Sequence, residues 1–97
     1  MKPMVPRADQ TFVPSADVVS RVIDGEAVLL DLVSGRYLGL NDVATRVWEL
    51  LAEGKDFGAI QAAILAEFDV PADVLEGDLD ALFTDMRARG IIRAGAP

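Results

Sequence analysis

Apolar and β-branched residues dominate the early part of the chain in two short runs, Val18–Ile23 and Glu26–Leu32. Runs of this kind favour strands. Asp24-Gly25 lies between them and is a strong signal for a two-residue hairpin turn, which would pair Val19 with Leu30. We expect one face to cover the core with Val19, Val28, Leu30 and Leu32, while the other face carries Val18, Val22, Ala27 and Leu29.

A second turn follows at Val33–Arg36, where Gly35 can take a positive φ angle. The segment Arg36–Leu40 then returns as a third strand, with Leu38 on one face and Tyr37 on the other. The simplest topology is a three-stranded antiparallel meander in which the second strand lies in the middle.

Helical spacing of apolar residues governs the rest of the chain. Asn41 is a suitable N-cap for a first helix that Gly54 ends, and Asp56 is a suitable cap for a second. A third helix begins at Pro71 or, through a capping box, at Asp73. The apolar stripes are Ala44, Val47, Trp48 and Leu51; Phe57, Ile60, Ile64 and Phe68; and Leu75, Leu79, Leu82 and Met86. Three strands followed by three helices predict an α+β fold with helices on one face of a small sheet.

The length of 97 residues predicts one domain. Prolines in residues 1–13 indicate an irregular N-terminal arm, in which Thr11–Val13 is a short extended piece. Residues 14–93 form the domain. Ile91-Ile92 is expected to pack onto it after Gly90 ends the third helix, and 94–97 is expected to be a frayed tail.

Composition removes several classes of function. The net charge is −7 and the sequence pI is about 4.3, so we expect no nucleic-acid partner and no binding to anionic membranes. A winged-helix DNA binder is compatible with three helices, but the charge argues against it. No apolar run approaches the roughly 20 residues of a transmembrane helix. We therefore expect a soluble, cytoplasmic protein.

Catalytic chemistry has little to build on, because the chain contains neither cysteine nor histidine. The commonest nucleophile–base pairs and the commonest metal ligands are thus missing. The carboxylates between Asp69 and Asp80 are best explained as solvated helix caps and faces. We expect no enzyme, no cofactor and no metal site.

The strand Arg36–Leu40 is the most informative feature, because its outer edge carries only Arg36 as protection against pairing. Such an edge suits β-augmentation by a peptide, although the third helix could equally cover it. Trp48 is expected in the core. Tyr37 points off the core face and is the better candidate for a binding contact.

A set of motifs resembles the PqqD family over residues 14–93. They are Pro14-Ser15-Ala16-Asp17-Val18-Val19, Asp24–Asp31, Ser34-Gly35-Arg36-Tyr37-Leu38-Gly39-Leu40-Asn41, Val47–Leu51, Glu67–Val70, Asp78-Leu79 and Arg89–Ile92. The resemblance implies a winged-helix-like recognition element for ribosomally synthesised and post-translationally modified peptides (RiPPs). Such an element is a peptide chaperone that presents the leader of a precursor peptide to a modifying enzyme.

In that family the leader adds as a strand beside the third strand and lies in a groove against the third helix. The resemblance therefore implies peptide-binding roles for Arg36, Tyr37, Leu38, Gly39, Leu40, Leu75, Asp78, Leu79, Leu82 and Met86. It also implies that Arg36 and Arg87 could meet acidic leader residues. The length is that of a stand-alone element, serving a radical SAM enzyme as in PQQ biosynthesis or a lasso-peptide leader protease. A module that pairs strand edges with itself, as a weak homodimer, stays open.

Overall fold

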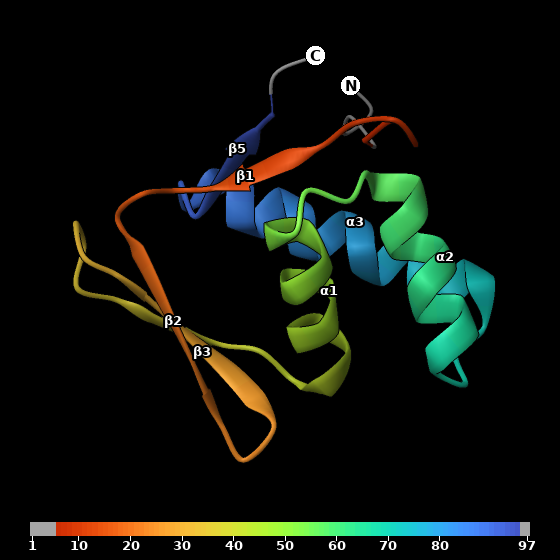
Figure 1. The fold of residues 1–97 in the computed structure, drawn as a ribbon, viewed down its shortest axis with the longest axis horizontal. Coiled ribbons are helices and arrows are strands. Elements are labelled where there is room, and N and C mark those ends of the chain that lie inside the picture. Colours follow the sequence, from red (N-terminus) through yellow and green to blue (C-terminus); the bar gives the residue numbers. More distant parts are fainter. Residues whose placement is uncertain (1–5, 96–97) are drawn as a thin grey trace.

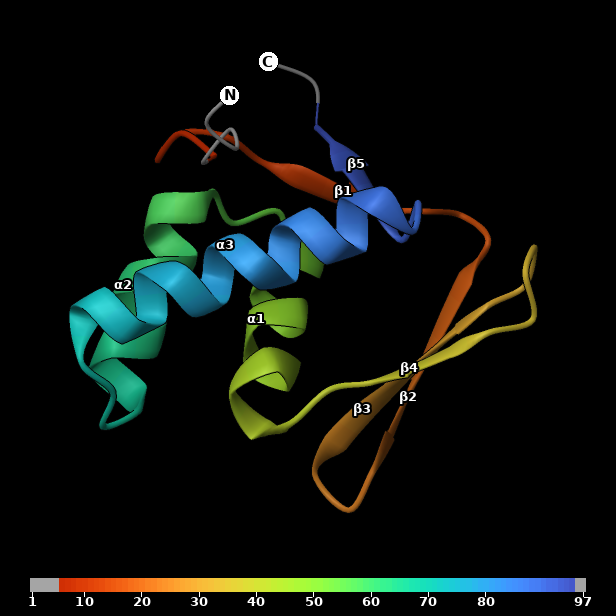
Figure 2. The same cartoon turned by 180° about the vertical axis from the view of Figure 1, so that it is seen from behind.

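The computed structural model describes residues 6–95, which form two small sheets and three helices (Figures 1 and 2). Strands β2, β3 and β4 form an antiparallel sheet in that order, and β1 pairs with β5 in a separate one. The elements are β1 (Phe12–Pro14), β2 (Val18–Ile23), β3 (Glu26–Asp31), β4 (Tyr37–Gly39), α1 (Asp42–Ala52), α2 (Phe57–Glu67), α3 (Ala72–Ala88) and β5 (Ile92–Ala94). The predicted α+β fold is confirmed, with the second sheet as an addition.

The β2–β3 hairpin has the turn and register that the sequence predicts. Asp24 and Gly25 have φ angles of 53° and 82°, which a type I′ turn requires at both central positions. Val19 lies opposite Leu30, and β3 is the central strand of the sheet. Local turn chemistry is therefore sufficient to fix this pairing.

The prediction of which hairpin face covers the core was wrong. Ala27 and Leu29 of β3 are buried, whereas Val19 is 47% exposed and Leu32 is 58% exposed. Both faces of β3 are apolar, so alternation alone could not choose between them. Packing against α1 decides the matter, because the helices lie on the side to which Ala27 and Leu29 point.

The helix boundaries follow the predicted capping residues at most positions. Asn41 and Asp56 accept hydrogen bonds from Ala44 and Ala59 backbone N–H groups, and Gly54 has a φ of 90° just after α1. Helix α3 starts directly after Pro71 without a side-chain cap. The alternative start at Asp73 was wrong, because Ala72 and Asp73 are already helical and Pro71 occupies the N-cap position in an extended conformation.

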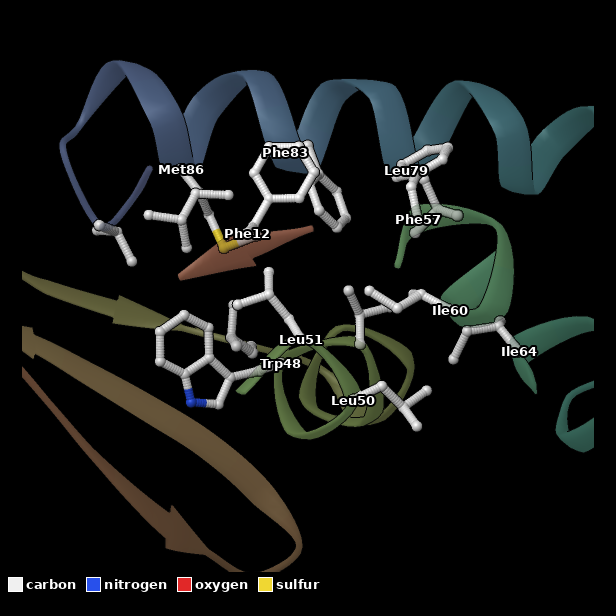
Figure 3. Close-up of a cluster of buried hydrophobic side chains, with 14 of the residues drawn as sticks. Phe12, Trp48, Leu50, Leu51, Phe57, Ile60, Ile64, Leu79, Phe83 and Met86 are labelled. Carbon is white, nitrogen blue, oxygen red and sulfur yellow. The ribbon is translucent and has the colours of Figure 1, made fainter. Parts of the chain in front are cut away.

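The hydrophobic core lies among the three helices and strand β1 (Figure 3). Phe83 of α3 packs edge-on against Phe12 and Phe57, with ring centroids 5.0 and 5.1 Å apart. Trp48 is buried, as predicted, and extends from α1 toward the sheet (Figure 3). The sheet thus rests on one side of a helical core.

Strand β1 ties the N-terminal segment to the end of the domain. Its residues Phe12–Pro14 pair with Ile92–Ala94, and Phe12 is fully inside the core. The expected boundaries at residues 13 and 94 therefore fall within paired strands. Residues 1–5 of the expected arm and 96–97 of the expected tail lie outside the described residues. Among residues 6–95, none of the helices combines the length and hydrophobicity that a membrane-spanning helix requires.

Candidate peptide-binding site

The outer edge of β4 carries backbone groups that point away from the sheet. The Asp31 N–H donates to the Arg36 carbonyl at 2.9 Å, and the Leu40 N–H donates to the Ala27 carbonyl at 2.8 Å. Along an antiparallel pair of strands, successive residues point their backbone N–H and C=O groups alternately toward the partner strand and away from it. The backbone groups of Tyr37 and Gly39 therefore point to the open side of β4, where they can pair with an added strand.

The turn before β4 is held by the side chain of Asp31. Its Oδ1 accepts a hydrogen bond from the Val33 N–H, and its Oδ2 accepts one from the Ser34 hydroxyl, both at 3.0 Å. These two hydrogen bonds lower the pKa of the Asp31 carboxyl below its usual 3.8, and the bond from Val33 has the larger effect. Gly35 completes the turn with a φ of 74°, as the sequence predicts. An ionised Asp31 thus sets where β4 begins.

The far end of β4 is fixed by Thr45, a buried polar residue of α1. Its hydroxyl oxygen accepts from the Ala27 N–H at 2.8 Å, and the hydroxyl donates to the Leu40 carbonyl at 3.3 Å. The hydroxyl therefore bridges β3 and the end of β4, where a direct backbone bond would otherwise lie. This bridge fastens the sheet edge to α1.

A hollow of about 550 Å³ lies between β4 and the C-terminal end of α3. Apolar side chains and two arginines surround it. Its lining consists of Leu29, Asp31, Ser34, Arg36, Tyr37, Leu38, Ala88, Arg89 and Ile91. Arg89 is oriented by an ion pair with Asp85, in which Nε lies 3.0 Å from Oδ1. We call this the β4 hollow.

A second hollow of about 390 Å³ lies between the start of α1 and the middle of α3. Its lining is Asn41, Val43, Ala44, Val47, Val70, Leu75, Asp78, Leu79, Ala81 and Leu82. Positions 78, 82, 85 and 89 share one face of α3, because residues three and four apart are neighbours on a helix. The two hollows therefore follow the same side of α3, and together we call them the α3 groove.

The α3 residues named from the sequence divide into two groups. Asp78 is exposed and Leu82 is half-buried, so both have surface available on the groove. Leu75, Leu79 and Met86 are buried in the core. Leu75 and Leu79 form part of the groove wall, whereas Met86 does not line the two hollows.

Ala81, Ala88 and Arg89 line the groove although the sequence reasoning did not select them. Small residues at helical spacing from Asp78 were the available signal, but they lack the hydrophobicity that marks a stripe. Arg87, which was selected, instead lies over the Phe12 ring, with its guanidinium carbon 5.8 Å from the centroid. Within residues 6–95, no group of three or more carboxylates gathers where it could hold a metal ion.

The open edge of β4 and the adjoining groove leave room for an extended strand, and the comparisons with known proteins identify the family of the chain. Residues 26–92 match the family described as coenzyme PQQ synthesis protein D (PqqD). The chain belongs to the PqqD family of RiPP recognition elements. Members of this family are non-catalytic peptide-binding proteins, which confirms the prediction that the chain is not an enzyme. No curated protein matches the chain significantly.

Two solved structures resemble this PqqD-family chain closely. One is TbiB1 in complex with the TbiA(beta) leader peptide, with 39% sequence identity and a TM-score of 0.78, covering 88% of this chain and 99% of that one. The other is a lasso peptide synthetase B1 complexed with the leader peptide. It has 28% sequence identity and a TM-score of 0.76, and the match covers 84% of this chain and 96% of that one. Both of these proteins were solved with a leader peptide bound.

Proposed function

We propose that this chain binds the leader segment of a ribosomally made precursor peptide and delivers the precursor to a modifying enzyme. The leader adds as a fourth strand beside β4 and places side chains in the α3 groove. The observation that carries this proposal is the position of the Tyr37 and Gly39 backbone groups, which face an open edge beside the β4 hollow. Backbone pairing supplies affinity, and the hollows select side chains.

The lining of the α3 groove indicates what the leader offers. Leu38 and Leu82, both half-buried, provide apolar surface for large aliphatic or aromatic side chains. Arg36 and Arg89 lie at the β4 end of the groove and suit acidic leader residues. The groove thus favours a leader with alternating apolar and polar positions, as an added strand requires.

Two classes of enzyme suit the role of partner. The family description points to PQQ biosynthesis, in which the partner is a radical SAM enzyme. The solved relative described as a lasso peptide synthetase B1 favours the second class, a leader protease. The chain shares 39% identity with TbiB1 over most of both chains, and this relationship supports a leader-binding role with either enzyme.

A titration followed by NMR tests the proposal. The probes are a synthetic leader from the precursor encoded beside this chain and the TbiA(beta) leader. We expect the largest amide shifts at Tyr37, Gly39 and residues 78–89, and none at Ser20 or Val22 on the far edge of the sheet. A cognate leader that leaves Tyr37 and Gly39 unmoved would contradict the binding mode. So would a stable dimer that buries β4 and excludes the peptide.

A further inference from the structure

The sheet has an exposed apolar face on the side opposite the helices. We call it the outer face and define it by Val19, Arg21, Ile23, Val28, Leu30 and Tyr37, which share one side of the sheet through their register. Ile23 is 56% exposed and Tyr37 is 68% exposed. A shallow hollow of about 280 Å³ lies among these six side chains.

Among residues 6–95, no element covers the outer face. The helices pack on the opposite side, where Ala27 and Leu29 are buried, and the β1–β5 pair lies toward the end of α3 (Figure 2). An antiparallel sheet with one solvated face ordinarily carries polar residues there. A contiguous apolar face marks an interaction surface more often than a scattered exposed residue does.

We propose that the modifying enzyme docks on the outer face through an apolar patch that carries a carboxylate for Arg21. This inference rests on the proposed leader-binding function. Arg21 is the charged residue of the hollow and lies between Val19 and Ile23 on the same side of β2, while Glu26, opposite Ile23, borders this side at the turn. A guanidinium surrounded by apolar side chains gains most from a carboxylate that becomes desolvated with it.

The outer face is continuous with the proposed leader site, and Tyr37 is the link. It lines both the outer-face hollow and the β4 hollow. A leader strand paired with β4 would add its own outward side chains to the outer face. A protein docked there would therefore contact Tyr37 and the leader together, which places the rest of the precursor beside the enzyme.

A second copy of this chain fits the outer face less well. A two-fold interface presents the same patch from both partners. An axis through the middle of this face would bring two Arg21 side chains together, and two chains that each carry a net charge of −7 repel one another. Self-repulsion thus favours a different protein over a second copy, and the continuity of the face with the leader site favours the enzyme that receives the leader.

Exposed residues allow a matched set of variants. Val19→Ser with Ile23→Ser removes apolar surface from the outer face, and Arg21→Glu reverses its charge, while Arg21→Lys keeps a cation. The control is Val22→Ser, on the same strand but the opposite side, where Val22 is 60% exposed. All these positions are exposed, so folding should be preserved. Circular dichroism and leader affinity check that point.

The experiment measures kcat/KM for the full precursor with the purified modifying enzyme encoded beside it, and the affinity of that enzyme for the leader-bound chain. We expect both outer-face variants to lose about tenfold or more in each, as hot-spot truncations do. Leader affinity should stay within about twofold, and Arg21→Lys should recover part of the loss. Val22→Ser should behave as the native chain does.

Two results would overturn the docking surface. One is unchanged processing by both outer-face variants. The other is a native dimer in sedimentation that the Val19→Ser/Ile23→Ser variant disperses, because a second copy would then occupy the face. A native chain that fails to bind the cognate leader would overturn the proposed function itself, whereas normal leader binding with unaffected processing overturns only the docking inference.

Discussion

Among residues 6–95, no strand pairs with the outer edge of β2 or of β4, and the two edges differ in what lies beside them. Just before β2, the Asp17 carbonyl accepts a hydrogen bond from the Leu32 N–H. Because successive residues of a strand point their backbone groups alternately toward and away from the partner strand, the groups of Ser20 and Val22 point outward. On β4 the groups of Tyr37 and Gly39 point outward. Only the β4 edge adjoins the α3 groove, whose hollows do not reach Ser20 or Val22. Unpaired backbone groups are common to both edges, whereas in the proposed binding mode the neighbouring groove would make the β4 edge the selective one.

The strongest test of this comparison places proline on each edge. Gly39→Pro removes an outward N–H from β4 without removing a bond to β3, and Ser20→Pro does the same on β2. We expect Gly39→Pro to weaken leader binding roughly 10- to 100-fold, because a leader carbonyl loses its donor and the ring obstructs pairing. Ser20→Pro should leave affinity within about twofold. Isothermal titration calorimetry measures both, and equal losses would abolish the distinction between the edges.

The next effect concerns the bridge that fastens the β4 edge to α1. Thr45→Val keeps the shape of the side chain but leaves the buried Ala27 N–H without its acceptor and the Leu40 carbonyl without its donor. We expect a loss of about 1–3 kcal/mol in the free energy of unfolding. Urea denaturation measures it.

Thr45→Ser is the control for this prediction, because it keeps the hydroxyl and should recover most of the stability. If Thr45→Val were as stable as the native chain, the hydroxyl would not be what secures the end of β4.

The groove itself can be obstructed without touching the core. Ala81 is exposed on α3 and lines the second hollow, so Ala81→Trp should fill it and weaken leader binding about tenfold. Ala62→Trp on the exposed surface of α2 is the matched control and should have no effect on binding. Fluorescence anisotropy of a labelled leader compares the two. An unaffected Ala81→Trp variant would confine the leader to the β4 hollow.

The smallest expected effect is a pH dependence of the stability of the turn before β4. The folded pKa of Asp31 is lowered, first by the hydrogen bond from Val33. Its stabilising contribution is therefore fully present above the unfolded pKa and is lost as pH falls through the lowered folded value. Amide protection factors at Gly35–Leu38, which correct for the slower intrinsic exchange at acidic pH, should fall as Asp31 becomes protonated.

Asp31→Asn is the comparison for that measurement, since it cannot ionise and should remove the part of the pH dependence that is specific to this turn. The same pH dependence in Asp31→Asn would assign the effect to other carboxylates.

Several features of the fold could be predicted because their causes are local. The turn at Asp24-Gly25, the caps at Asn41 and Asp56 and the positive φ of Gly35 each depend on residues close in sequence. The strand expected at Arg36–Leu40 is present, although β4 is limited to Tyr37–Gly39. The pairing of β1 with β5 escaped prediction because it joins segments at opposite ends of the chain.

The candidate site was predictable as a strand edge but not as a groove. Its α3 wall contains Ala81 and Ala88, which carry no hydrophobic signal, whereas the obvious stripe residues Leu75, Leu79 and Met86 became core. The role of Thr45 was also invisible, because a single threonine in a helix pattern does not indicate which strand groups its hydroxyl will meet.

The sequence by itself determined the order of the three meander strands and the three helices and the hairpin register, since these follow from residue spacing and turn chemistry. Only the tertiary structure decided that Ala27 and Leu29 face the core, that Val19 and Ile23 remain exposed, and which side of α3 borders β4. Both faces of the hairpin were apolar enough to be buried. The choice between them depended on where the helices packed, and that is a property of contacts between distant segments.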